Sequence, residues 1–109
     1  MEYANLGKML EHSAKRYSGS TSLIFKDLRI SYDDLNDAVD ALANHLRSLP
    51  VNKGDKVAIL LPNCPEFVIS YFAAARLGAV AVTLSIFSTP YELKHLLNNS
   101  DSRVLITTN

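Results

Sequence analysis

The chain has 109 residues, of which 48% are hydrophobic, so it is long enough for one modest core or for a piece of a larger one. Its 11 basic and 11 acidic residues give zero formal net charge, which argues against nucleic acid or an anionic membrane as a partner. Its single cysteine excludes an internal disulfide, and no apolar run reaches the roughly 20 residues of a membrane span, so we expect a cytoplasmic protein.

The first element that the sequence predicts is an amphipathic helix that begins near Asn5. This early amphipathic pattern differs from the apolar run of a secretory signal. Ser18, Gly19 and Ser20 end the helix, and two short strands, Ser22–Phe25 and Leu28–Ser31, then flank a Lys26-Asp27 turn as a hairpin. The apolar stripe of the helix consists of Leu6, Met9, Leu10, Ala14 and Tyr17.

A long second helix begins where Ser31-Tyr32-Asp33-Asp34 resembles a capping box. Its apolar residues alternate four and three positions apart, as expected for a helix with one buried face. The loop from Pro50 to Asp55 follows, and we place a subdomain boundary there, between residues 1–52 and 53–109. The apolar stripe consists of Leu35, Val39, Leu42, Leu46 and Leu49.

The sequence at the centre of the chain predicts a βαβ unit, in which two parallel strands are joined by a helix through a right-handed connection. A buried strand, Val57–Leu61, ends at Pro62, and Asn63 or Cys64 can cap a core helix over Glu66–Leu77, with Pro65 at its first position. Gly78 then ends this helix in a left-handed conformation, and Val80–Leu84 forms the second strand.

The last third predicts one more helix and one more parallel strand. Thr89-Pro90-Tyr91-Glu92 is a capping box with proline at the first helical position, and we expect the helix to bury Leu93, Leu96 and Leu97. Residues Asn98 to Ser102 look like a turn, and Arg103–Thr107 forms a third strand. The fold class is therefore α/β, a helix, hairpin and helix followed by a βαβαβ unit.

Few residues are candidates for catalysis or metal binding. An acidic cluster on the second helix could bind a metal, but its position in the first turns favours solvated charges that complement the helix dipole. The three histidines lack a second ligand at metal-binding spacing, so surface roles are favoured. Cys64 could be reactive at a helix N-terminus, but with no base nearby in sequence a packing or capping role is favoured. The residues are Asp33, Asp34, Asp37, Asp40, His12, His45 and His95.

Motifs for common catalytic and cofactor sites are absent from the sequence. Neither a Gly-x-Gly-x-x-Gly nor a Gly-x-x-x-x-Gly-Lys-Ser/Thr phosphate loop follows any predicted strand. No Ser-His-Asp set or pair of catalytic carboxylates can be defended. We therefore predict no catalytic, cofactor-binding or metal-binding residue in these 109 residues.

The order of elements and five local phrases resemble the N-terminal part of adenylate-forming, AMP-binding acyl-CoA synthetases. The sequence Pro-Asn-Cys-Pro-Glu-Phe is more similar to the corresponding segment of fatty-acid or aryl-acid CoA ligases than to that of peptide-synthetase adenylation domains. One departure is Lys26-Asp27, where members of the family often have Gly-Asp. The five phrases are Ile30–Leu35, Gly54–Phe67, Arg76–Val82, Thr89–Leu93 and Arg103–Thr107.

The resemblance implies a parent enzyme that joins a carboxylic acid to ATP, releases pyrophosphate and passes the acyl group to coenzyme A, with magnesium. The family's phosphate loop, nucleotide motifs, hinge and catalytic lysine lie downstream of the matched region, so we expect this chain alone to be inactive and to bind neither ATP nor coenzyme A. The acid substrate does not follow from the resemblance.

The resemblance also implies that the rest of the parent chain is the natural partner. The hairpin and the parallel strands would belong to different sheets with open edges, and the apolar helix faces would lack part of their cover. We therefore expect a homo-oligomer when the chain is isolated. The alternatives are a self-contained α/β binding or interaction domain with a ligand crevice at the strand ends, and a peripheral membrane location for the parent.

Overall fold

A computed structural model of the chain describes residues 13–17 and 19–108. Strands β1 (Thr21–Phe25) and β2 (Leu28–Ser31) form an antiparallel hairpin in which Phe25 pairs with Leu28. The two-residue turn places Lys26 in the left-handed region, with φ 54°, a conformation that costs a residue with a side chain roughly 1 kcal/mol. The predicted hairpin is thus confirmed, with a turn that glycine would suit better.

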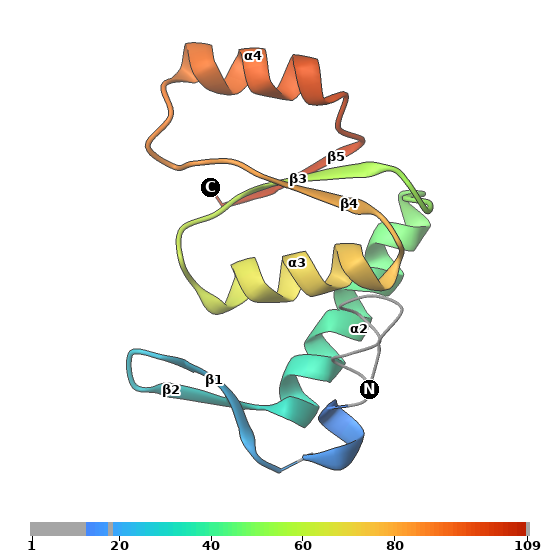
Figure 1. Cartoon of the computed structure of the whole chain (residues 1–109), viewed down its shortest axis with the longest axis vertical. Helices are drawn as coiled ribbons and strands as arrows, with labels where there is room; N and C mark the ends of the chain where they lie inside the picture. Colours follow the sequence, from blue (N-terminus) through green and yellow to red (C-terminus); the bar gives the residue numbers. More distant parts are fainter. Residues whose placement is uncertain (1–12, 18, 109) are drawn as a thin grey trace.

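Helix α2 (Tyr32–Ser48) begins directly after the hairpin. The Ser31 hydroxyl accepts a hydrogen bond of 3.1 Å from the Asp34 N–H, which satisfies one of the free donors in the first turn. The chain then passes through the loop after α2 into the parallel sheet. Figure 1 shows the hairpin and α4 at opposite ends of the long axis of the molecule.

The second half of the chain forms a parallel sheet with one helix on each face. Strand β3 (Lys56–Leu60) lies between β4 (Val80–Thr83) and β5 (Val104–Thr107), and all pairs are parallel. Helix α3 (Pro65–Arg76) connects β3 to β4 on one face, and α4 (Pro90–Ser100) connects β4 to β5 on the other (Figure 1). The predicted βαβαβ unit is confirmed.

The core lies where α2, α3 and the sheet meet. Because Ala73 and Ala74 have small side chains and are fully buried, α3 can approach its neighbours closely. The partly buried Tyr71 and Phe72 rings extend this cluster. The cluster unites Leu35, Val39, Ala43 and Leu46 of α2 with Val57 and Ile59 of β3, Ala73 and Ala74 of α3, and Val51 and Leu61.

The predicted α2 stripe needs one correction, and one buried residue of α2 was missed. Leu49 is 46% exposed because the helix ends there and Leu49 is its C-cap, and Ala43 is buried instead, beside α3. This helix face was expected to lack part of its cover; α3 packs along most of it, and Leu49 remains exposed.

The predicted burial of α4 was wrong. Leu96 is 43% exposed, Leu93 and Leu97 are only partly buried, and no residue of the helix is fully buried. The helix also continues to Ser100, through part of the predicted turn, and ends at Asp101, whose φ is 56°. The capping box therefore starts the helix as predicted without providing a buried face.

The predicted first helix falls mainly outside the described residues, together with His12 and the stripe members Leu6, Met9 and Leu10. Residues 13–16 are helical and Ala14 is buried. Tyr17 is 47% exposed, although its ring packs against Tyr32 with 6.2 Å between centroids.

Candidate functional site

The carboxyl end of the parallel sheet is where a ligand site would be expected. The connections through α3 and α4 lie on opposite faces of the sheet (Figure 1), so the strand order reverses between β3 and β5. In open α/β sheets, ligands bind outside the carboxyl ends of the strands at such a reversal. The fold therefore has the topology of a binding crevice, and the side chains there decide whether it can do chemistry.

Those side chains are mostly apolar. The loop after β3 is Leu-Pro-Asn-Cys, and the loop after β4 runs from Leu84 to Thr89 with the sequence Leu-Ser-Ile-Phe-Ser-Thr. Neither loop contains a glycine, a charged residue or a histidine. Phe87 is 90% exposed at this end of the sheet. The two loops thus offer neither a phosphate cradle nor a general acid or base.

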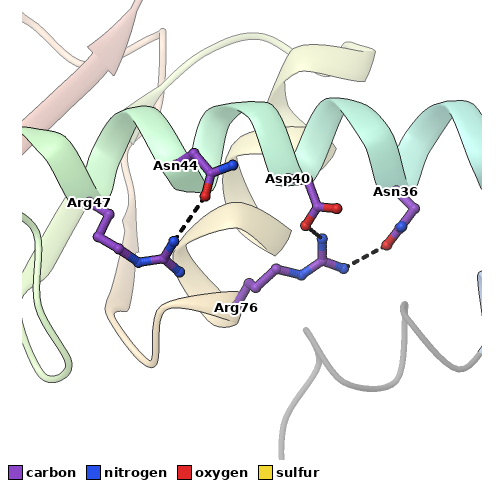
Figure 2. Close-up of polar contacts among 5 residues, drawn as sticks. All are labelled: Asn36, Asp40, Asn44, Arg47 and Arg76. Carbon is purple, nitrogen blue, oxygen red and sulfur yellow. Dashed lines mark hydrogen bonds and ion pairs between the residues drawn. The ribbon is translucent and has the colours of Figure 1, made fainter.

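The best-formed polar cluster lies elsewhere, between α2 and α3. Figure 2 shows Arg76 extending from α3 to two side chains of α2. Its Nη1 donates to Asp40 Oδ1 at 2.5 Å, and its Nη2 donates to Asn36 Oδ1 at 2.8 Å. Arg76 is 8% exposed and Asp40 54%, so the pair lies at the rim of the core. This geometry holds the two helices together.

Asp40 belongs to the predicted acidic cluster and is exposed, but its pairing with Arg76 was not predicted. The signal was present in the sequence, because Arg76 is the single charged side chain inside the otherwise apolar run after Glu66. Asp33 and Asp34 lie in the first turn of α2, and Asp37 is exposed, as expected. Within residues 13–17 and 19–108, no group of three or more histidine, cysteine or acidic residues could hold a metal ion.

The remaining candidates have local structural roles. Cys64 is the N-cap residue of α3, but its side chain makes no capping hydrogen bond and instead packs, partly buried, against the core cluster. His45 is exposed, and the exposed His95 contacts Asn99 on the same helix at 3.0 Å. These positions agree with the packing and surface roles that the sequence favoured.

An open hollow of about 520 Å³ at the amino ends of the strands was not predicted. Its charged groups are of both signs and are partly engaged in the local fold. Arg103 Nε donates to the Pro50 carbonyl at 3.3 Å, and the Asp55 carboxylate accepts from the Asn52 N–H at 2.8 Å. The balance of charge selects no ligand class. The lining residues are Leu49, Gly54, Asp55, Lys56, Asp101, Ser102 and Arg103.

Among the described residues, a perturbed ionisation is found in the capping box of α4. The Thr89 N–H donates to Glu92 Oε1 at 3.0 Å, and the Glu92 N–H donates to Thr89 Oγ1 at 3.1 Å. The backbone hydrogen bond, followed by the side-chain one, lowers the pKa of Glu92 below 4.5. This is a structural effect of a helix start and implies no catalysis.

Comparison with known proteins gives a consistent result. The family model described as "AMP-binding enzyme" matches residues 10–109. The acyl-CoA ligase sidI of Aspergillus fumigatus is 36% identical over 105 residues, which cover 94% of this chain and 18% of the ligase. A crotonobetaine/carnitine–CoA ligase of Salmonella paratyphi A is 36% identical over 108 residues, which cover 94% of this chain and 21% of the ligase.

Among solved structures, the inhibitor-bound N-terminal domain of FACL13 from Mycobacterium tuberculosis superposes with a TM-score of 0.89 at 34% identity. The match covers 94% of this chain and 26% of that domain. The chain therefore spans about a fifth of the length of the curated relatives it matches and about a quarter of this single domain.

Proposed function

The chain belongs to the family of AMP-binding enzymes, and from this premise we propose that it supplies the fold-forming N-terminal portion of an ATP-dependent carboxylate–CoA ligase. The observation that carries the proposal is the match over nearly the whole chain to ligases of this family at 36% identity. The parent enzyme would form an acyl-adenylate from a carboxylic acid and ATP and then transfer the acyl group to coenzyme A. The sequence Pro-Asn-Cys-Pro-Glu-Phe favours a fatty acid or an aryl acid as the substrate class.

We propose that the described residues do not form an ATP site by themselves. A nucleotide phosphate needs backbone N–H groups presented by a glycine-rich loop or a helix N-terminus, usually with a lysine or arginine. Helices α3 and α4 begin at this end of the sheet, but the loops that lead into them contain neither glycine nor a basic residue, and Gly54 and Gly78 both lie at the amino end of the sheet. We therefore assign no catalytic, nucleotide-binding or magnesium-binding role to this chain and assign ATP, magnesium and coenzyme A to the parent.

A covalent chimera tests the proposal. The chain would replace the matching 108-residue segment of the crotonobetaine/carnitine–CoA ligase, and acid-dependent release of pyrophosphate would be measured. We expect activity because the segment is fold-forming and the recipient supplies the nucleotide machinery. A chimera that carries Gly78→Val, which strains the end of α3, is the matched control and should be less stable. A soluble, folded chimera with no activity would contradict the proposal.

The isolated chain provides a second test. We expect no heat of binding when Mg-ATP or coenzyme A is titrated into it, because no phosphate cradle follows β3 or β4. A dissociation constant in the micromolar range would show that these residues form a nucleotide site. It would favour the alternative of a self-contained binding domain.

Other predictions accompany this proposal. We propose a subdomain boundary at the Pro50–Asp55 loop, self-association of the isolated chain through its open sheet edges, and a cytoplasmic location for the parent. No helix within the described part of the chain is long and apolar enough to cross a membrane. Sedimentation equilibrium at micromolar concentration would measure the self-association.

A further inference from the structure

Two aromatic side chains are almost fully exposed near the start of α4. Phe87 is 90% exposed and Tyr91 81% exposed, and Ile86 beside them is 48% exposed. Residues of this kind are the ones that most often anchor protein interfaces, since each buries a large apolar area with little loss of conformational freedom. Three exposed apolar residues within six positions of the chain are more than the isolated exposed apolar residue that any soluble protein shows.

The element that carries these side chains is itself poorly covered. None of the residues of α4 is buried, and α4 makes no extensive contact with another helix or strand in the part of the chain that the structure describes. The sheet face on the same side leaves Leu105 of β5 40% exposed. Parallel sheets are normally covered on both faces. The face of this sheet on the side of α4 is therefore incompletely covered.

The neighbouring sheet edges are also unprotected. Strands β4 and β5 are the outer strands, with sequences Val-Ala-Val-Thr and Val-Leu-Ile-Thr. Native proteins protect exposed edges with lysine, proline, bulges or a covering segment, and neither strand contains a proline or a charged residue. Unprotected edges beside exposed aromatic residues indicate a surface that another polypeptide covers.

The structural match indicates which polypeptide covers this surface. This chain matches 26% of the FACL13 N-terminal domain with a TM-score of 0.89, so the matched fold in that relative lies within a domain about four times larger. We propose that Phe87 and Tyr91 anchor this chain to the remaining part of an AMP-binding domain, which can associate without a covalent connection. This inference rests on the proposed function and adds to it the surface and the two residues that carry the contact.

Co-expression tests the proposal. A tagged version of the chain would be produced together with the FACL13 N-terminal domain from which the matched segment has been removed, and the amount of truncated domain that co-purifies would be measured. We expect the wild-type chain to retain the truncated domain. The double variant Phe87→Ser, Tyr91→Ser should retain at least roughly tenfold less, as expected for the loss of two aromatic anchors.

The matched control is Leu49→Ser, which removes a 46% exposed apolar side chain at the amino end of the sheet. It should retain as much truncated domain as the wild type. Thermal unfolding of each variant alone should show midpoints close to the wild type, because the replaced side chains are exposed. This measurement separates lost docking from lost folding.

Three results would overturn the inference: no capture by the wild-type chain, equal capture by the double variant, or an equal loss in Leu49→Ser. A double variant that loses self-association but keeps the truncated domain would assign the aromatic surface to a second copy instead. If the covalent chimera is active while non-covalent capture fails, the docking inference is wrong and the proposed function stands. An inactive chimera would overturn the proposed function itself.

Discussion

Helices α2 and α4 begin in the same way and lie in different surroundings. Ser31 and Thr89 each accept a hydrogen bond of 3.1 Å from the third residue of the helix that follows. Helix α2 buries four residues against the core, whereas α4 buries none. A local capping sequence therefore determines where a helix starts, and the remainder of the fold determines whether its apolar face is covered.

This difference predicts where stability resides. Leu46 of α2 is 1% exposed and Leu96 of α4 is 43% exposed. Leu46→Ala should lower the free energy of unfolding by about 3 kcal/mol through lost burial and a cavity, whereas Leu96→Ala should lower it by less than about 0.5 kcal/mol. Urea unfolding followed by circular dichroism measures both. Similar losses would mean that α4 belongs to the same cooperative core.

The next largest loss of stability is expected for a substitution at the end of α3. Gly78 has φ 71°, and a Cβ there would lie 3.1 Å from Lys53 Cγ, whereas Gly54 has φ 87° and no atom within 4 Å. Gly78→Val should cost about 2 kcal/mol through backbone strain and crowding, and Gly54→Val about 1 kcal/mol through strain alone. Thermal unfolding of the two variants tests the order. An unchanged midpoint for Gly78→Val would contradict this account of how the helix ends.

The two caps allow a smaller, paired test. Ser31→Ala should lower the global free energy of unfolding by about 1 kcal/mol, because α2 is part of the core. Thr89→Ala removes an equivalent cap, but it should leave the global value unchanged within error and only loosen α4. Chemical denaturation combined with amide hydrogen exchange distinguishes the two effects. A global loss in Thr89→Ala would show that α4 is coupled to the core.

The smallest expected effect is a pH dependence of the stability of the α4 start. The hydrogen bonds from Thr89 lower the pKa of Glu92 below 4.5, so the carboxylate stabilises the start of α4 at pH values above the unfolded pKa. This contribution is lost as the pH falls through the lower folded value. The Thr89 amide should therefore be protected equally at pH 7 and pH 5 and lose protection in more acidic solution. In Glu92→Gln this acid-dependent loss should be absent.

Local sequence signals predicted the elements well. Apolar runs, caps and Gly78 placed the five strands and helices α2 and α3 within one or two residues of their observed bounds, because strand composition and helix ends depend on neighbouring residues. The start of α4 was also placed correctly, but its end lies three residues beyond the predicted one. The resemblance to a family was confirmed by the match over residues 10–109. These signals needed no knowledge of which elements pack together.

Contacts between distant residues were not predicted. The bond between Arg76 and Asp40 joins residues 36 positions apart, and its formation depends on how α2 crosses α3. Leu96 has the spacing of a buried residue, but its burial requires a partner surface that the described residues do not provide. The hollow beside Arg103 is lined by two segments far apart in the sequence, residues 49–56 and 101–103, so no local pattern marks it. The absence of a catalytic residue stays a prediction.

Native-state hydrogen exchange tests the contrast between the two regions most directly. Amides of β3 and the buried face of α2 should exchange only through global unfolding, whereas those of α4 should exchange through local opening at a much lower free energy. Adding the truncated AMP-binding domain should raise protection in α4 and leave the core unchanged. Equal protection of α4 and α2 in the isolated chain would contradict the account, because it would show that these residues complete their own fold without a partner.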